Sequence, residues 1–304
     1  MTRRFELTDA EWERLAPLLP SSGGRGGQWV DHRRVVSGIL YRVRTGVPWR
    51  DLPERFGPWK TCYERHRRWS ADGTWRRILD ELRIGADLAE GDDWTVGVDS
   101  TAVRAHQHAA GARHRRPRRL RKRGTLRRDE SDGREALGRS RGGLTTKIHL
   151  AADRRCRPIA RLTSPGQRFD GTMLLRVLGQ VRIKRCGIGR DRVRPGRVLA
   201  DKAYSSRAIR AHLRRRGIKA VIPEKTDQQK WRKRRGAAGG RPVAFDSQAY
   251  KDRNVVERCI SKLKQFRAVA TRYDKRAFVY DGTIDVASIK IWLRDLTQDL
   301  PDTA

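Results

Sequence analysis

Apolar residues recur at two different spacings along the chain, and the change of spacing divides the chain into two parts. In the first part they recur every three or four residues, as at Val36, Leu40 and Val43, which is typical of helices with one buried face. After about residue 90 the pattern changes to short runs of apolar and β-branched residues, beginning with WTVGVDSTAV (94–103). The sequence therefore predicts an all-α domain followed by a mixed α/β domain.

The predicted helical domain covers residues 1–82. A first helix begins after Thr8, because Glu11 three residues later completes a capping box. A second helix covers about 31–44, and a third, 59–70, follows a Gly-Pro break, which resembles a helix-turn-helix with the third helix in the recognition position. We expect four tryptophans of this region to form its core rather than to stack on bases; they are Trp49, Trp59, Trp69 and Trp75. The basic residues predicted on the exposed face of the third helix are Lys60, Arg65, Arg67 and Arg68.

The predicted α/β domain covers residues 94–300, after a linker at 83–93. Five apolar runs predict five strands of a mixed sheet, and strands two and three form a hairpin from LTTKIHLAAD and PIARLTS. Helices are expected in DGTMLLRVLGQV, which Asp170 could cap, and in three later segments. These later helices are predicted at about 205–216, 250–266 and 283–297, and basic insertions at about 104–143 and 225–245.

Two aspartates follow predicted strands. Asp99 ends strand one and Asp201 ends strand four, positions where a carboxylate is costly to bury unless it is paired or bound to metal. Each one alone could simply cap the next turn. Strands one and four can lie side by side in this sheet, so the two aspartates would meet at its edge, within reach of Glu257 on a later helix.

The helix at 250–266 carries a polar stripe of Tyr250, Arg253, Glu257 and Lys264. One interpretation is a surface salt bridge between Arg253 and Glu257. The other is that Glu257 joins Asp99 and Asp201 in a metal site. Three carboxylates without Cys or His suit Mg²⁺ or Mn²⁺, and two such ions about 4 Å apart can catalyse in-line reaction at a phosphodiester.

Composition favours a polyanionic partner. The chain has 70 Lys and Arg against 35 Asp and Glu, a net charge of +35, which suits nucleic acid. An anionic membrane surface is the competing partner, but no long apolar run or signal-like N-terminus supports it, so we expect a cytoplasmic protein at the nucleoid. The four cysteines form no CxxC pair, which indicates neither zinc nor a disulfide framework.

The stripe matches the glutamate-helix signature of one enzyme family, and the chain resembles the DDE transposases of bacterial insertion sequences, of the IS-five type, along nearly its whole length. VGVDST, GRSRGGLTTKIHLAAD (138–153), VLADKAY and the N-terminal EWERLAPLLP are also similar to that family. The resemblance implies an RNase H-like catalytic domain behind a DNA-binding domain. It further implies a transposase that cleaves the terminal inverted repeats of its element with two Mg²⁺ or Mn²⁺ ions and joins the 3′-OH to target DNA.

Residue roles follow from this resemblance together with the predicted positions. Asp99, Asp201 and Glu257 would be catalytic metal ligands, and Lys264 would contact a phosphate near the cleaved end. Arg253 could neutralise DNA or orient Glu257, and Tyr250 could pack on the terminal nucleotide or on protein. Two further DNA contacts are candidates: Lys202, and Trp231, which could stack on a flipped base or fold its insertion against the domain. Action on two DNA ends predicts a homodimer or larger oligomer on double-stranded DNA.

Two other functions remain open at this point. A resolvase or host nuclease could use the same fold without transposition. An architectural or regulatory DNA- or RNA-binding protein would suit the charge, but it would have no use for three acids among arginines, since each weakens phosphate binding.

Overall fold

A computed structural model describes residues 5–21, 29–84, 94–112, 135–185 and 187–298. The N-terminal region forms helices as the sequence predicted. The capping box is confirmed: Thr8 Oγ1 accepts a hydrogen bond from the Glu11 amide at 3.2 Å, and a Glu11 carboxylate oxygen accepts one from the Thr8 amide at 2.9 Å. The helices are α1 (Asp9–Leu15), α2 (His32–Thr45), α3 (Trp59–Ala71) and α4 (Thr74–Leu82).

Helix α3 departs from its predicted surface at one residue. Lys60, Arg67 and Arg68 are exposed, but Arg65 is buried. Its guanidinium carbon lies 3.9 Å from the centroid of the Trp29 ring and its Nη1 lies 2.8 Å from His32 Nδ1. The prediction of an exposed Arg65 is wrong because aromatic stacking holds this side chain inside the helical region.

The strands form one mixed sheet, ordered β2-β3-β1-β5-β6, in which β4 pairs with β3 and β7 with β1. β1, β3 and β4 are antiparallel neighbours, whereas β5 and β6 continue the sheet in parallel to β1. This is the RNase H-like arrangement, and it confirms that predicted strands one and four lie side by side. The strands are β1 (Thr95–Ala105), β2 (Gly138–Ser140), β3 (Gly143–Ala152), β4 (Pro158–Pro165), β5 (Arg197–Ala200), β6 (Lys219–Val221) and β7 (Thr271–Arg272).

The sequence predicted that strand β1 ends at Asp99, and this prediction is wrong. The strand continues to Ala105 because β3 pairs with it as far as Arg104. The parallel ladder with β5 stops earlier, at the pair Val98 and Ala200. Asp99 is therefore an internal residue of β1, at the point where the neighbouring strand ends.

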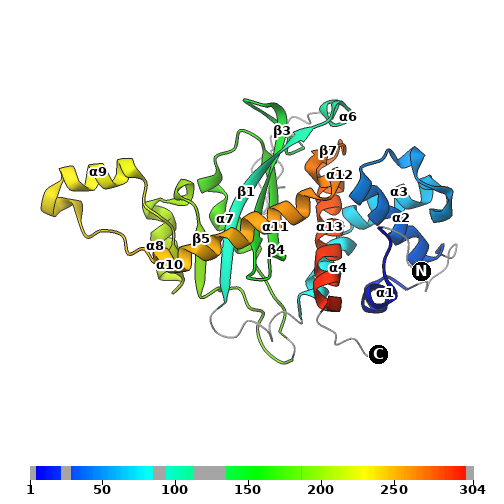
Figure 1. Ribbon diagram of the computed structural model, residues 1–304, viewed down its shortest axis with the longest axis horizontal. Coiled ribbons are helices and arrows are strands. Elements are labelled where there is room, and N and C mark those ends of the chain that lie inside the picture. Colours follow the sequence, from blue (N-terminus) through cyan, green and yellow to red (C-terminus); the bar gives the residue numbers. More distant parts are fainter. Residues whose placement is uncertain (1–4, 22–28, 85–93, 113–134, 186, 299–304) are drawn as a thin grey trace, which may run out of the picture.

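The later helices agree with the sequence in position but not in every detail. The insertion at 225–245 contains a helix, α9, which extends away from the body of the molecule (Figure 1). Within the insertion at 104–143, β1 ends, α6 forms and β2 begins, while residues 113–134 lie outside the described part. The helices are α6 (Gln107–Ala110), α7 (Leu174–Gly179), α8 (Arg207–Arg215), α9 (Thr226–Arg234), α10 (Ser247–Tyr250), α11 (Asn254–Lys264), α12 (Arg267–Ala270) and α13 (Ala277–Gln298).

One apolar core joins the helical region to the end of the chain. Trp69 and Trp75, both buried, belong to the same cluster as Tyr280, Ile284 and Trp292 of α13. Figure 1 shows α13 standing between the N-terminal helices and the sheet. A second cluster fills the other face of the sheet, under α7 and α8. Among the described helices, none is both long and apolar enough to cross a membrane.

Candidate active site

The site begins at Asp99, in the middle of β1. Its Oδ1 accepts a hydrogen bond of 2.7 Å from the amide of Ser100. Burial raises the pKa of the Asp99 carboxyl, while that hydrogen bond and the charge of Arg253 act to lower it. A buried carboxylate whose pKa is raised has its negative charge poorly compensated by the protein alone.

Asp201 follows β5 directly and lies at the same edge of the sheet. Its Oδ1 accepts a 2.8 Å hydrogen bond from the amide of Ala203, so it caps the 3-10 turn Lys202–Tyr204. Lys202 is exposed on this turn, and Tyr204 is buried in the core. Capping therefore occurs at Asp201, and it leaves the second carboxylate oxygen for another role.

Glu257 reaches the edge from α11, which packs across β1. The close approach depends on Gly97, where an added Cβ would lie only 3.1 Å from Val256 Cβ. The Glu257 side chain is 53% exposed. Gly97 and Asp99 are two residues apart on β1, so they lie on the same face of the strand. Helix α11 packs on Gly97 and therefore holds Glu257 on the face where Asp99 lies.

Arg253 connects two of the three acids. One of its guanidinium nitrogens, Nη2, lies 2.6 Å from Glu257 Oε1 and 3.4 Å from Asp99 Oδ2. The salt bridge predicted between Arg253 and Glu257 is present, and Arg253 also pairs with Asp99 on β1. The charges of Asp201 and Glu257 also act to raise the pKa of Asp99, so all three acids feel one another.

The donor set suits a hard divalent cation. Asp99, Asp201 and Glu257 offer only carboxylate oxygens, and the poorly compensated charge of Asp99 favours a cation beside it. Over the described ranges, however, no three His, Cys, Asp or Glu side chains are gathered as a ready metal cluster. A positively charged guanidinium instead lies between Asp99 and Glu257. The three carboxylates therefore have the chemistry to bind divalent ions, provided that the Arg253 guanidinium shares the position between Asp99 and Glu257 or moves out of it.

The remaining candidate DNA contacts lie on three helices, α9, α10 and α11. Lys264 is exposed on α11, and Tyr250 packs against Phe245 with ring centroids 5.2 Å apart. Trp231 is 60% exposed on α9 and lies under Arg235 rather than against the domain. A cavity of about 500 Å³ opens beside Asp201; its lining residues are Asp201, Lys202, Ala203, Lys225, Thr226 and Asp227.

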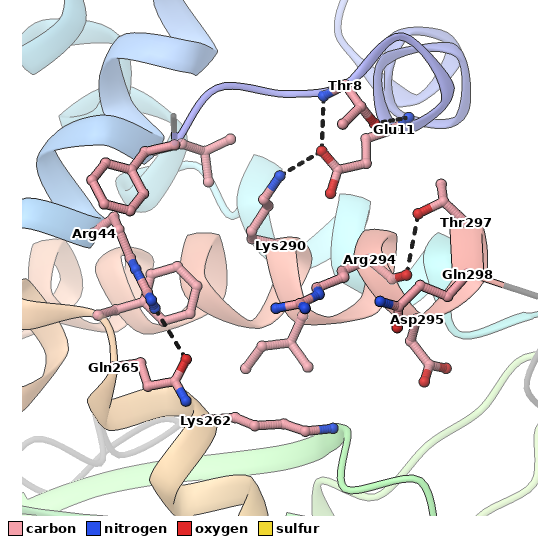
Figure 2. A pocket seen from close by; sticks show the side chains of 14 residues that line it. Thr8, Glu11, Arg44, Lys262, Gln265, Lys290, Arg294, Asp295, Thr297 and Gln298 are labelled. Carbon is pink, nitrogen blue, oxygen red and sulfur yellow. Dashed lines mark hydrogen bonds and ion pairs between the residues drawn. The ribbon is translucent and has the colours of Figure 1, made fainter. Parts of the chain in front are cut away.

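A larger cavity, of about 710 Å³, lies elsewhere, among α1, α2, α11 and α13 (Figure 2). Several of its charged groups are engaged within the protein. Lys290 pairs with Glu11, and Arg44 stacks on Phe266 and lies 3.4 Å from Gln265 Oε1. This cavity lies between the helical region and α11, the helix that carries Glu257, and none of the three acids lines it.

Asp170, which the sequence predicted as a helix cap, lies beside the candidate active site instead. Asp170 does not cap its helix, because the 3-10 turn Asp170–Thr172 begins after Phe169 and no side chain caps it. Its carboxylate instead accepts hydrogen bonds from Ser100 on β1 and Lys147 on β3. Only the folded sheet brings these segments together, so no local pattern could have identified the contact.

Comparison with known proteins assigns the fold to a family. Residues 7–79 match the transposases of the IS4/5 family (DUF4096). Residues 90–281 match the family described as the transposase DDE domain, which is more than half of the chain. The chain belongs to the DDE transposase family. The three acids of the candidate site lie within the matched segment.

Two relatives match parts of the chain, and the second is named as a transposase. The transposase is 41% identical to protein y4sN of Sinorhizobium fredii over 108 residues. This match covers 35% of the chain and 82% of that protein. It is 28% identical over 151 residues to a protein of Brucella ovis named as a transposase for insertion sequence element IS6501, covering 50% of the chain and all of that protein.

A solved structure of a pre-cleavage Mos1 transpososome covers 91% of the transposase and 81% of its own chain, at 11% identity and a TM-score of 0.24. Likeness at this level carries no argument about the fold or the chemistry. The assignment rests on the sequence matches and on the strand order of the sheet.

Proposed function

We propose that the transposase binds the terminal inverted repeats of its own insertion sequence, cleaves the DNA ends, and joins the freed 3′-OH groups to target DNA. Double-stranded DNA would be the partner, at the nucleoid, and action on two ends implies at least a dimer. The helical region, residues 1–82, would bind the repeats. Lys60, Arg67 and Arg68 on α3 offer it an exposed basic face.

Asp99, Asp201 and Glu257 would hold two Mg²⁺ or Mn²⁺ ions in this mechanism. Such ions, when bound, activate the attacking oxygen and stabilise the departing 3′ oxygen. Ser100 and Ala203 orient the two aspartates through their backbone amides. Lys264 and Lys202, both exposed, are positioned to bind phosphates near the cleaved bond.

Arg253 and two aromatic residues would complete the DNA contacts. Arg253 holds Glu257 against Asp99, and it can neutralise a phosphate when the cations take over these acids. Tyr250 lies beside Arg253, with the guanidinium carbon 5.9 Å from the centroid of its ring, where a terminal nucleotide could pack. Exposed Trp231 offers a stacking surface for a flipped base.

The observation that carries this proposal is the single guanidinium shared by Asp99 and Glu257, which come from β1 and α11, far apart in the sequence. An architectural DNA-binding protein gains nothing from acids brought together in this way. Together with Asp201, whose charge also acts on Asp99, they would supply the carboxylates that cation-assisted phosphodiester chemistry requires.

Cleavage of a labelled DNA that carries the element's ends tests the proposal. With Mg²⁺ the parent protein should nick the end and give joined product, and a chelator should abolish both. Glu257→Ala should bind this DNA with parental affinity and lose cleavage by about a thousandfold or more, since it removes a ligand of the reacting centre.

Glu13→Ala is the matched control, because Glu13 is an exposed glutamate on α1, outside the candidate site. It should cleave like the parent. If Glu257→Ala cleaves as fast as Glu13→Ala, the three-acid site is not catalytic. If both variants and the parent bind without cutting in any divalent ion, only DNA binding survives.

A further inference from the structure

Asp170 lies behind Asp99, on the opposite face of the sheet. Successive residues of a strand point to opposite faces, so Asp99 faces α11 while Ser100 faces the other side. Ser100 Oγ donates a 2.8 Å hydrogen bond to Asp170 Oδ1, and the Ser100 amide donates one of 2.7 Å to Asp99 Oδ1. One residue, Ser100, therefore connects the two carboxylates.

Lys147 fixes Asp170 in turn. Its ammonium group lies 2.9 and 3.1 Å from the two carboxylate oxygens of Asp170 and 2.9 Å from the carbonyl oxygen of Arg168. These three acceptors can use all three ammonium protons, so Lys147 has one well-defined position. His149 also faces Asp170, with Nδ1 3.7 Å from Oδ1, but burial lowers its pKa to about 4, so it is neutral at pH 7. Lys147 is thus the cation that balances Asp170.

The position of this linkage along β1 matters. The β5 ladder ends at Val98 and the β7 ladder begins at Arg104. Among the described strands, the intervening stretch of β1 is paired on one side only, with β3. Contacts made by side chains consequently decide how firmly the backbone at Asp99 and Ser100 is held. Asp170, in the turn after β4, holds Ser100 directly, and Lys147, on β3, holds Asp170.

We propose that Asp170 is a positioning residue of the active site, which with Lys147 anchors Ser100 and so fixes the Asp99 carboxylate for divalent-cation binding. The inference rests on the proposed role of Asp99 as a metal ligand. Asp170 itself touches neither the cation nor the DNA in this scheme. It acts on Asp99 through the hydroxyl and the amide of Ser100.

Mn²⁺ binding to the full-length transposase tests this directly, with free Mn²⁺ measured by electron paramagnetic resonance and no reaction needed. Asp170→Asn should weaken Mn²⁺ binding by about tenfold or more, as expected when a group that orients a metal ligand is lost. Ser100→Ala should weaken it similarly, although it removes no charge. The double variant should lose little more than either single variant, because both act on one linkage.

Asp191→Asn is the control, since Asp191 forms an exposed ion pair with Arg182 before β5. It should bind Mn²⁺ like the parent. Parental Mn²⁺ affinity in both Asp170→Asn and Ser100→Ala would overturn the inference, and so would weakening confined to Asp170→Asn, which would mean a general charge effect. If Asp170→Asn does not fold, as judged by thermal denaturation, Ser100→Ala alone decides.

Asp99→Ala separates this inference from the proposed function. It should lose the Mn²⁺ site altogether. If Asp99→Ala binds Mn²⁺ like the parent, the proposed three-acid site is wrong. If it loses binding while Asp170→Asn and Ser100→Ala retain it, the site stands and only the role of Asp170 fails.

Discussion

Single residues set how near Glu257 comes to Asp99. Arg253 draws the two carboxylates toward one guanidinium, and Gly97 provides the space under α11 that this requires. Each effect changes when the atoms in contact move by a few tenths of an ångström. The chemistry of the site is therefore sensitive to substitutions that change neither an acid nor a basic residue.

Gly97→Ala should separate α11 from β1. The added methyl group would meet Val256 Cβ at 3.1 Å and a Val255 methyl at 3.3 Å, so the helix must move, at a cost of about 1–3 kcal/mol. We expect end cleavage to fall by about tenfold or more, because the acids are displaced, while DNA affinity stays unchanged. Gly179→Ala, at a site with no atom within 4 Å of the new Cβ, should cleave like the parent. Equal cleavage by the two variants would contradict the role assigned to Gly97.

At the level of elements, the sequence predicted what local patterns encode. The capping box, the β3–β4 hairpin and the helix of Glu257 were all found where the spacing of apolar residues placed them. The extent of β1, the strands β2 and β7 and the helix α9 were not predicted, so the described sheet has seven strands where five were expected. Strand length depends on the partner that pairs along the strand, and β7 is two residues long, too short for any periodicity.

The same reasoning explains which site residues the sequence revealed. Asp99 and Asp201 were selected because each is an acid at the end of an apolar run, and Glu257 because it lies on the polar stripe of its helix that matches the family signature. Arg65 was misplaced because helical spacing cannot foresee stacking on Trp29, a residue from another segment. Asp170 was overlooked as a cap because its partners, Ser100 and Lys147, come from two other strands.

The junction of α3 with α13 should make stability depend on pH. His66 is fully buried in α3, with Nε2 3.2 Å from Thr283 Oγ1 of α13, and burial lowers its pKa from 6.5 to about 4. Between these values the unfolded chain binds more protons than the folded one, so stability falls as the pH falls from about 6.5 to 4. The loss should be on the order of 3 kcal/mol.

Thermal denaturation of the parent and of His66→Gln across this range checks the prediction. The variant should be less stable than the parent at pH 7, and it should lose less stability on acidification. Buried His149, whose pKa is also lowered to about 4, accounts for part of the remaining loss. Parallel pH profiles for the two proteins would rule out His66 as the titrating group.

At the level of the whole molecule, the helical region and α13 share one core. The division of the chain at about residue 82 remains a prediction, and this packing bears on it. A fragment of residues 1–82 lacks Tyr280, Ile284 and Trp292 of that core. We expect the isolated fragment to give no cooperative thermal transition by circular dichroism, whereas the full chain gives one. A fragment that melts cooperatively would show that the helices are an independent domain.

This shared core also has a consequence for synthesis on the ribosome. The N-terminal helices emerge before α13, the partner that covers their apolar face, has been translated. A nascent chain cannot complete the core of its helical region until the Glu257 helix has also been made. Premature termination would then leave exposed apolar surface for proteases rather than a stable DNA binder that blocks the element's ends, and each folded copy would carry both halves of the enzyme.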